Sequence, residues 1–365
     1  MIRSCKFHSI GLLLSLAIQL VAFSDSSEIP LPDLLKESME KARTLPLQGI
    51  LSFRRGISSG TPSEFVTKVK LCRCVNSRER MEVLEPTFLQ NSLMVKTYNQ
   101  LWVTPLPKET IDQLPREIRF HLWFRIFNDI TASIDLRHFD LLLENYNLLL
   151  ENADTVAGRS TQVLYIQSKN LKTYRKRPSL RIWVDKEIRI PLKCEQYDND
   201  SKWVETVQFE QLAFEETADC QTGTDGLIEI PPPRPPQDQA ALSLNFTPLQ
   251  PKSIPIGFKE VDTHIFKRDE DIVYETQYWD GLARFSTFQR LQRPEEQDAQ
   301  SHEPEEEKYK VKKFKDKDIY YRELKGIRIV AMGDLESGAM SYMLSSLEVC
   351  NPSPETKSDS QSDQK

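Results

Sequence analysis

Residues 154–214 constrain the fold most, because their apolar side chains recur at every second position. Apolar and polar residues alternate along 180–185, 188–195 and 203–209. Successive side chains of a strand point to opposite faces, so each run predicts a strand with one buried face and one wet face. In the first run the expected wet face carries Arg181, Trp183 and Asp185. Short polar breaks between the runs suit hairpin turns, so we predict an antiparallel meander rather than a parallel α/β sheet.

The length and charge of the chain bound its class. With 365 residues, the chain is long enough for two domains with ordinary cores. Its 28% charged and 39% hydrophobic residues are normal for a soluble globular protein. A formal net charge of -6 argues against nucleic acid as a partner, because proteins that bind phosphate backbones usually carry a basic surplus.

The N-terminus has the pattern of a secretory signal peptide, residues 1–24. Arg3 and Lys6 precede an apolar stretch over 10–23, and small residues before Asp25 suit cleavage near Ser24. The alternative is an uncleaved anchor, although the apolar run is short for a full span. No later stretch is long and apolar enough to cross a membrane. We therefore expect an exported, soluble mature protein.

An odd number of cysteines remains after removal of this leader, which leaves at least one unpaired in an oxidising compartment. These residues are Cys72, Cys74, Cys194, Cys220 and Cys350. The first two form a C-x-C pattern on an expected strand, so both thiols point to one side. We expect buried thiols or one long-range disulfide, and the spacing leaves the pairing open.

The first domain, residues 25–215, is predicted to be α+β. A helix is expected over 32–44, where apolar residues cluster on one helical face, and a short helix over 136–143. An aromatic-rich helix or turn region is expected over 118–130. Strands are expected over 47–53, 65–75, 78–84, 92–98 and 100–103, before the meander. Mainly antiparallel strands with few helices predict a strongly curved sheet or an open barrel.

A smaller α+β domain, residues 256–350, is expected after a proline-rich linker at 216–255. The linker holds a polyproline run at 231–236, which favours an extended spacer. The second domain has strand patterns joined across Asp280-Gly281, a typical hairpin turn, and a closing helix over 338–347. The tail 351–365 is polar and is expected to be disordered.

Motifs of known catalytic or metal sites are missing from the sequence. The histidines do not have the H-x-x-x-H spacing of a helical metal site, and there is no G-x-S-x-G, phosphate-binding P-loop or G-x-G-x-x-G. No two carboxylates are paired on a defined scaffold for acid and base catalysis. We therefore expect a binding protein that is not an enzyme and needs no cofactor or metal.

The apolar strand faces of the first domain are the best candidate for a binding site. A curved sheet that its helix covers only partly leaves an apolar cavity that can take an acyl chain. The alternative for each residue is that it belongs to a filled hydrophobic core and lines no cavity. Candidates for the lining are Phe65, Val69, Leu71, Met81, Val83, Leu93, Val95, Trp102, Leu164, Ile166, Ile182, Val184 and Phe209.

A lysine cluster in the second domain is a candidate patch for phosphate groups or an acidic partner. Its members are Lys308, Lys310, Lys312, Lys313, Lys315 and Lys317. The alternative, slightly favoured, is an edge strand whose lysines block aggregation. Acidic residues at 303–307 partly cancel its field.

Segments in both domains carry a resemblance to a known family. In the first domain they are residues 49–53, 145–146, 156–159, 174, 181–185, 190–193, 205 and 209. In the second domain they are residues 257–258, 278–286, 326–334 and 345–347. In this order, and over nearly the whole mature chain, the segments resemble the MucB/RseB family.

This resemblance implies a periplasmic regulator of envelope-stress sigma-factor signalling. It implies a first domain with the unclosed β-barrel of the lipoprotein carriers LolA and LolB, and a second that docks the periplasmic segment of an anti-sigma factor. Binding of lipid, lipoprotein or lipopolysaccharide acyl chains is implied to release that partner. The rival hypothesis is a periplasmic lipoprotein or lipid carrier of the LolA type. The sequence does not fix the oligomeric state, and a homodimer stays open.

Overall fold

A computed structural model describes residues 29–57, 63–74, 78–97, 100–113, 134–169, 177–214, 223–230, 244–293, 310–314 and 317–349. The expected leader, the aromatic region 118–130 and the tail 351–365 lie outside these residues. Within them, no helix is long and apolar enough to span a membrane.

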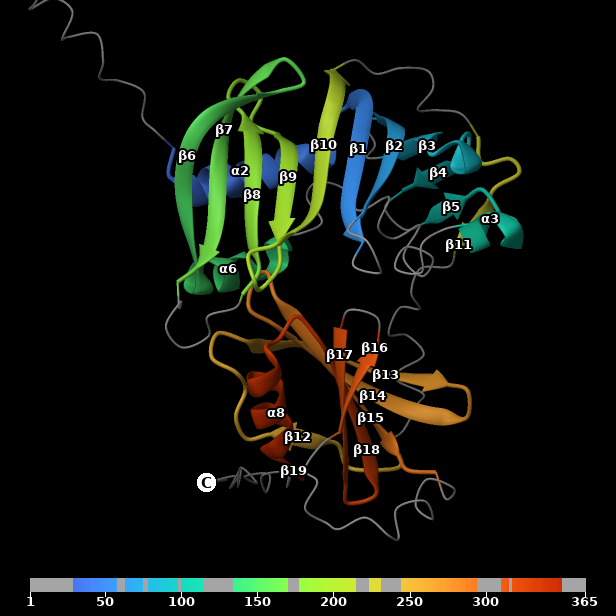
Figure 1. The fold of residues 1–365 in the computed structure, drawn as a ribbon, viewed down its shortest axis with the longest axis vertical. Coiled ribbons are helices and arrows are strands. Elements are labelled where there is room, and N and C mark those ends of the chain that lie inside the picture. The colour runs from blue at the N-terminus through green and yellow to red at the C-terminus, as the bar shows by residue number, and fades with distance from the viewer. Residues whose placement is uncertain are drawn as a thin grey trace, which may run out of the picture.

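The first unit is built on one open antiparallel sheet of eleven strands (Figure 1). Its order is β11-β5-β4-β3-β2-β1-β10-β9-β8-β7-β6, so β11 and β6 are the two edges. The strands are β1 (Leu47–Ile57), β2 (Ser63–Arg73), β3 (Glu79–Glu85), β4 (Leu93–Lys96), β5 (Leu101–Val103), β6 (Tyr146–Val156), β7 (Arg159–Ser168), β8 (Ser179–Asp185), β9 (Pro191–Tyr197), β10 (Trp203–Ala213) and β11 (Ile228–Ile230). Neighbours in the meander β6 to β10 pair in sequence order. The predicted fold class, an unclosed and mainly antiparallel sheet with few helices, is confirmed.

Helix α2 (Leu31–Thr44) crosses the far side of β6 to β9 in Figure 1. Its buried residues Leu34, Leu35, Ser38, Met39 and Ala42 recur at helical spacing, which confirms the predicted helix. The helix ends before Leu45, which is extended because Pro46 disfavours a helical conformation in the preceding residue. The Arg73 guanidinium donates to the carbonyl of Ala42 in the last turn, so it satisfies a carbonyl that the helix leaves open.

The remaining helices among the described residues of the first unit are short. They are η1 (Thr87–Leu89), α3 (Lys108–Gln113), η3 (Leu136–His138) and α6 (Phe139–Asn145). The last two confirm the short helix predicted over 136–143. Phe139, Leu141 and Leu142 of α6 are buried, and the helix leads directly into β6.

The second unit is a six-stranded antiparallel sheet with the order β13-β14-β15-β18-β17-β16. Its strands are β13 (Lys259–Arg268), β14 (Asp271–Trp279), β15 (Arg284–Leu291), β16 (Lys310–Phe314), β17 (Lys317–Leu324) and β18 (Ile327–Gly333). Helix α8 (Ser337–Ser345) buries Ala339, Met340, Met343 and Leu344 against this sheet, which confirms the closing helix. The Asp280-Gly281 turn joins β14 to β15 as predicted, with Gly281 at a φ of +111°.

Two strands lie inside the region expected to be a linker. β11 pairs with β5 of the first sheet, and β12 (Leu249–Pro251) pairs with β19 (Leu347–Val349) of the second unit. Each has only three residues, too few to show a period, so the sequence pattern does not reveal them. The segment between the two units is therefore shorter than residues 216–255.

One face of the meander differs from its prediction. Trp183 and Asp185 of β8 are 6% and 1% exposed, although both fall on the face expected to be wet. The indole Nε1 of Trp183 donates to Asp154 Oδ2 over 2.8 Å, and Lys193 Nζ lies 4.1 Å from its ring centroid. Long side chains from the neighbouring strands thus cover β8, so the prediction of a wet face is wrong for these two residues.

Cys72 forms a disulfide bond. Cys74 lies beside it, and both side chains are buried on the same side of the strand, as the C-x-C spacing predicts. Cys194 is buried in the main core. Cys220 and Cys350 lie outside the described residues.

Candidate binding core and interdomain junction

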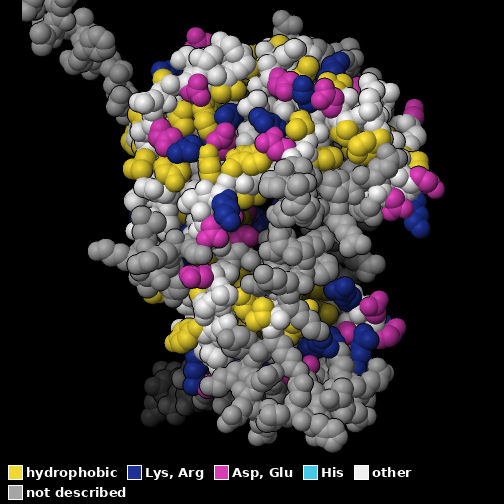
Figure 2. All heavy atoms as spheres, viewed as in Figure 1, with side chains coloured by type: hydrophobic (Ala, Val, Ile, Leu, Met, Phe, Trp, Pro, Cys, Tyr) yellow, Lys and Arg dark blue, Asp and Glu magenta, His cyan; other side chains and the backbone are white. Residues whose placement is uncertain are grey.

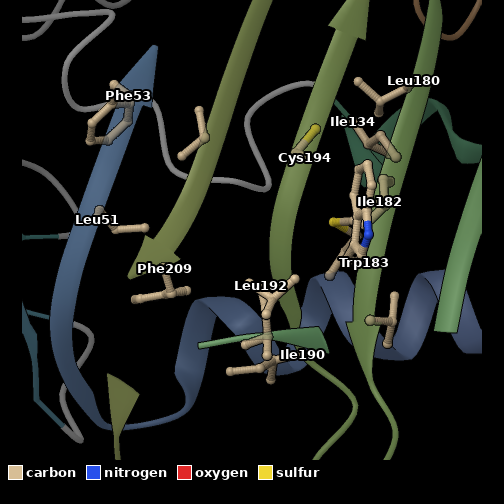
Figure 3. Close-up of a cluster of buried hydrophobic side chains, with 14 of the residues drawn as sticks. Leu51, Phe53, Ile134, Leu180, Ile182, Trp183, Ile190, Leu192, Cys194 and Phe209 are labelled. Carbon is tan, nitrogen blue, oxygen red and sulfur yellow. The ribbon is translucent and has the colours of Figure 1, made fainter. Parts of the chain in front are cut away.

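The predicted lining residues of the first unit largely come together in one core. Nine of them belong to a single buried cluster, each at most 5% exposed: Val69, Leu71, Met81, Val83, Leu164, Ile166, Ile182, Val184 and Phe209. Figure 3 shows Ile182 and Phe209 in this cluster beside Leu51 and Leu192, two residues that the prediction missed. Helix α2 covers the cluster with Leu34, Leu35 and Met39.

The other four candidates lie apart from the centre of this core. Phe65 is partly buried and packs against its margin. Val95 pairs with Trp102, and Cys72 lies in line with them across the neighbouring strands. These three side chains lie on the face of the sheet opposite to Met94 and Val103. Leu93 lies two positions before Val95, so it is on the same face of the sheet, and it is only half-buried. Strand alternation therefore separates Leu93, Val95 and Trp102 from the cluster.

The core has a partly exposed rim on β6. Leu150 pairs with Leu164, and the two side chains share the inner face of the sheet. Leu164 is fully buried, whereas Leu150 is 54% exposed. Leu148, two positions before, packs partly against the cluster. This rim is where the apolar interior comes nearest to solvent along β6.

A second site, the interdomain junction, joins the two units through a buried carboxylate. Asp280 is fully buried in the turn between β14 and β15 of the second unit. Its carboxylate lies 2.7 Å from an Arg177 guanidinium nitrogen and 3.0 Å from the Tyr146 hydroxyl. Two backbone N–H groups of its own turn, from Leu282 and Ala283, donate to Oδ1. The carboxylate therefore has partners from both units, which a buried charge requires.

Asn145 ties the backbone of the second unit to the end of α6. Its Nδ2 donates to the carbonyl oxygens of Gly257 at 2.9 Å and Asp280 at 3.0 Å. Arg177 donates to the Ile256 carbonyl and stacks over the Phe258 ring, with its Cζ 5.2 Å from the centroid. Figure 1 shows α6 at the end of the first sheet that faces the second unit.

Two glycines permit this close approach. A Cβ on Gly281 would lie 2.4 Å from the Leu142 Cα, and one on Gly257 would lie 2.3 Å from Asn145 Oδ1. Both have positive φ values, which favour glycine. Leu282, next in the chain, packs against the core of the first unit. The turn thus inserts an apolar side chain and a buried carboxylate into the neighbouring unit.

Burial dominates the protonation behaviour of the junction. It raises the pKa of the Asp280 carboxyl, and Arg177 and the turn N–H groups act in the opposite direction. Burial and the Asp280 carboxylate hold the pKa of Tyr146 well above 10.0. Tyr146 therefore stays protonated at neutral pH and can donate its hydrogen bond.

The lysine cluster falls on one edge of the second sheet. Lys310, Lys312 and Lys313 belong to β16, which pairs with β17 and is the last strand of its sheet. Lys317 begins β17, and Lys308 and Lys315 lie outside the described residues. This position at an edge agrees with the alternative explanation of the cluster, in which the lysines of an edge strand block aggregation.

Among the described residues, no group of three His, Cys, Asp or Glu side chains could hold a metal ion. The junction itself is a closed set of ion pair and hydrogen bonds, which suits a structural tie between units.

Sequence reasoning missed the junction, because it interpreted Asp280-Gly281 only as a hairpin turn. The available signal was the acidic residue between aromatic and apolar neighbours, in Tyr278-Trp279-Asp280 followed by Leu282. A buried carboxylate needs a cation, but nothing local in the sequence points to Arg177, more than a hundred positions upstream.

Comparisons with known proteins agree with this architecture. A family model, the MucB/RseB N-terminal domain, matches residues 110–231. A crystal structure of MucB in complex with MucA(peri) matches with a TM-score of 0.57 at 17% identity, over 88% of this chain and 99% of that chain. A structure of the Pseudomonas aeruginosa MucA/MucB complex matches with a TM-score of 0.55 at 19% identity, over 87% and 98%. No curated protein sequence gives a significant match.

At these identities the two structures establish a shared fold. The match of the family model at 110–231 spans strands β6 to β10 and strand β11, which pairs with β5 at the other edge of the sheet. Residues 110–231 are therefore similar to the N-terminal domain of the MucB/RseB family, in agreement with the resemblance in the sequence.

Proposed function

We propose that this protein is an exported binding protein that docks the periplasmic segment of a membrane-anchored anti-sigma factor. The observation that carries the proposal is the match in fold, over both units, to a MucB chain that was solved in complex with MucA(peri). The signal-peptide pattern of residues 1–24 supports export to the periplasm. In this function the bound protein shields its partner from proteolysis, and no catalysis is required.

The interdomain junction supports a partner that touches both units. Asp280, Arg177 and Tyr146 form a buried polar contact between them. Buried polar networks whose members are all satisfied specify one geometry, so the surfaces of the two units are presented in one orientation. A rigid receptor loses less entropy on binding than one whose domains move independently.

The test uses the mature chain, residues 25–365, and the periplasmic segment of the anti-sigma factor encoded in the same genome. Calorimetry and co-purification measure the complex, and a scrambled segment of equal composition is the control. We expect a stable complex with the native segment alone, together with slower proteolysis of that segment. Absence of binding, with a folded protein of the expected circular dichroism, contradicts the proposal.

We also propose that the first unit senses acyl chains of lipid, lipoprotein or lipopolysaccharide. The apolar cluster under α2 supplies the chemistry, and the exposed Leu150 marks the rim by which a chain can approach it. Because nine candidate residues are at most 5% exposed, an acyl chain must displace side chains or α2 to enter.

Native mass spectrometry after incubation with lipopolysaccharide or a triacylated lipopeptide tests this second step. A bound lipid that also dissociates the anti-sigma segment is the expected result. Bound lipid without any anti-sigma complex favours the rival function, a lipid or lipoprotein carrier. A mass without lipid under all conditions contradicts both lipid functions and leaves the docking proposal to its own test.

A further inference from the structure

The disulfide bond of Cys72 joins it to a cysteine outside the described residues. Cys72 is disulfide-bonded, whereas Cys74 and Cys194, the other cysteines that the structure describes, are thiols. The mature chain has two further cysteines, Cys220 and Cys350. One of these two is therefore the partner, and the positions of the neighbouring strands decide between them.

Cys72 lies in a row of paired residues that crosses the outer face of the first sheet, opposite to the core cluster. On one side of Cys72 the row passes through Gln48 of β1 to Ala213, the last residue of β10. On the other side it ends at Glu229 of β11, the next strand in the chain. Between Cys72 and Glu229 the row contains Arg80, Val95 and Trp102. The connection from β10 to β11 therefore begins and ends in the row of Cys72.

Cys220 is close enough in sequence to reach Cys72 from both ends of this connection. Neighbouring strands are about 4.8 Å apart, so Cys72 lies roughly 10 Å from Ala213 and roughly 19 Å from Glu229 along the row. Cys220 comes seven residues after Ala213 and nine before Glu229. At about 3.3 Å per residue these two lengths of chain span up to roughly 23 Å and roughly 30 Å. Both lengths exceed the distances to Cys72.

Cys350 is held in the other unit. It directly follows Val349, the last residue of β19, and β19 pairs with β12. Adjacent Cα atoms are about 3.8 Å apart, so Cys350 stays beside β19. Figure 1 shows β19 at the lower end of the second unit, near β12 and α8, whereas β2 belongs to the upper unit. A single residue does not bridge these two places, which leaves Cys220.

We infer that Cys72 and Cys220 form a disulfide bond, which fastens the connection between β10 and β11 to strand β2. The two thiols lose two electrons and two protons, and the disulfide of a thiol–disulfide oxidoreductase in the exporting compartment is reduced in exchange. The bond joins positions 148 residues apart, and a loop of this length strongly restricts the unfolded chain. The inference goes beyond the docking and lipid functions proposed above, because it needs neither ligand.

The bond supports a strand that has little hold of its own. β11 is an edge strand that pairs with β5 through three residues. Ile228 is 52% exposed, and Glu229 is exposed as well. Figure 2 shows acidic and basic side chains at this end of the first unit, on the right of the view, so solvent reaches it. The disulfide in the preceding connection limits how far β11 can leave the sheet, which makes this edge redox-sensitive.

Peptide mapping without reduction tests the assignment, because trypsin separates all five cysteines of the mature chain. Cleavage places Cys72 in peptide 71–73, Cys74 in 74–78, Cys194 in 194–202, Cys220 in 203–252 and Cys350 in 329–357. The protein is exported with its own leader, and its thiols are blocked with N-ethylmaleimide before digestion. Mass spectrometry should find peptide 71–73 linked to 203–252, and peptide 74–78 blocked. A different partner for peptide 71–73, or its recovery in blocked form, overturns the assignment.

Hydrogen exchange tests what the bond does. Cys72→Ser and Cys220→Ser should each speed exchange of the amides of residues 228–230 by roughly tenfold. The double variant should exchange no faster than either single variant, because each substitution removes the same bond. Amides of residues 180–184 in the interior strand β8 should exchange equally in all these proteins, which shows that the sheet stays folded.

The matched control is Cys74→Ser. Cys74 is a thiol in the same buried pair as Cys72, so its substitution should leave exchange of residues 228–230 unchanged. Exchange in Cys72→Ser that equals that of the unmodified protein overturns the role of the bond in holding β11. A double variant that exchanges faster than both single variants shows that the two cysteines act separately, and it overturns the bond itself.

Discussion

The Tyr146 hydroxyl lies 3.0 Å from both carboxylate oxygens of Asp280, although 134 positions separate the two residues. Tyr146 begins β6 of the first unit, and Asp280 lies in a turn of the second. Both side chains are almost completely buried. In such surroundings an unpaired polar group is costly, so the contact couples the stability of one unit to the presence of the other.

Asp280→Asn should therefore destabilise the whole chain. The substitution removes the charge that neutralises Arg177, and loss of one partner of a buried ion pair costs about 3–5 kcal/mol. Urea unfolding measures the loss, followed by circular dichroism. Tyr146→Phe removes only a hydrogen bond and should cost less, about 1–3 kcal/mol.

The matched control for Asp280→Asn is an exposed ion pair across the same junction. Lys259 Nζ lies 2.8 Å from Glu144, and both side chains are more than half exposed. Lys259→Met should cost less than about 1 kcal/mol, because exposed pairs contribute little. Equal losses for Asp280→Asn and Lys259→Met would show that the buried carboxylate does not hold the units together.

Glycine substitutions at the junction test the close approach of the two units. Gly281→Ala combines a positive φ with a Cβ position 2.4 Å from the Leu142 backbone, so strain and steric overlap should together cost about 2–5 kcal/mol. Gly326→Ala is the control, because Gly326 has a φ of +72° and open space around its Cβ position. It should cost only about 1–2 kcal/mol.

Thermal unfolding of both variants gives the comparison. If Gly326→Ala is as destabilising as Gly281→Ala, backbone strain alone explains the effect, and the contact with α6 contributes nothing. A Gly281→Ala protein whose two units unfold in separate transitions would show that the turn couples them.

Local periodicity predicted the elements that depend on short-range patterns. The alternation along 180–185 gave β8, and the spacing of Leu34, Leu35 and Met39 gave α2. Asp280-Gly281 gave the turn between β14 and β15. In each case the signal and the structure lie within one short stretch of the chain, so a single sequence suffices.

Features set by long-range contacts were missed for a physical reason. The burial of Trp183 depends on Asp154 and Lys193, which come from other strands. The burial of Asp280 depends on Arg177 in the other unit. Alternation assigns residues to faces but does not say what covers a face, which is also why it could not single out Leu150 at the rim.

Stability should fall at acid pH through Asp185. Burial acts to raise the pKa of this carboxyl, but hydrogen bonds from Arg159 and from the N–H groups of Ile188 and Glu187 outweigh it and lower the pKa below 3.8. A depressed folded pKa contributes stability above the unfolded value, and this contribution disappears as pH falls through the folded value. Asp185→Asn should therefore be less stable than the unmodified protein at about pH 7.

The difference between the two proteins should shrink as the pH falls below about 4, because Asp185 of the unfolded chain is protonated there first, and it should disappear once the folded carboxyl, with its lower pKa, is protonated as well. Urea unfolding at several pH values measures it, and equal stability of the two at neutral pH would contradict the role of the carboxylate. Glu187→Gln is the control. Glu187 also accepts from Arg159 but its side chain is 82% exposed, so the change should be small at every pH.

A paired truncation distinguishes plain core from an accessible lipid site in the first unit. Ile182 is fully buried at the centre of the cluster, whereas Leu150 is 54% exposed at its rim. If the cluster is closed core, Ile182→Ala leaves a cavity and should cost about 2–5 kcal/mol, while Leu150→Ala should cost less than about 1 kcal/mol. A residue that lines an open site loses few contacts on truncation, so a small cost for Ile182→Ala would indicate that lipid can reach it. Urea unfolding of delipidated protein gives both values, and repeating the measurement with bound lipid shows whether Ile182 contacts the acyl chain.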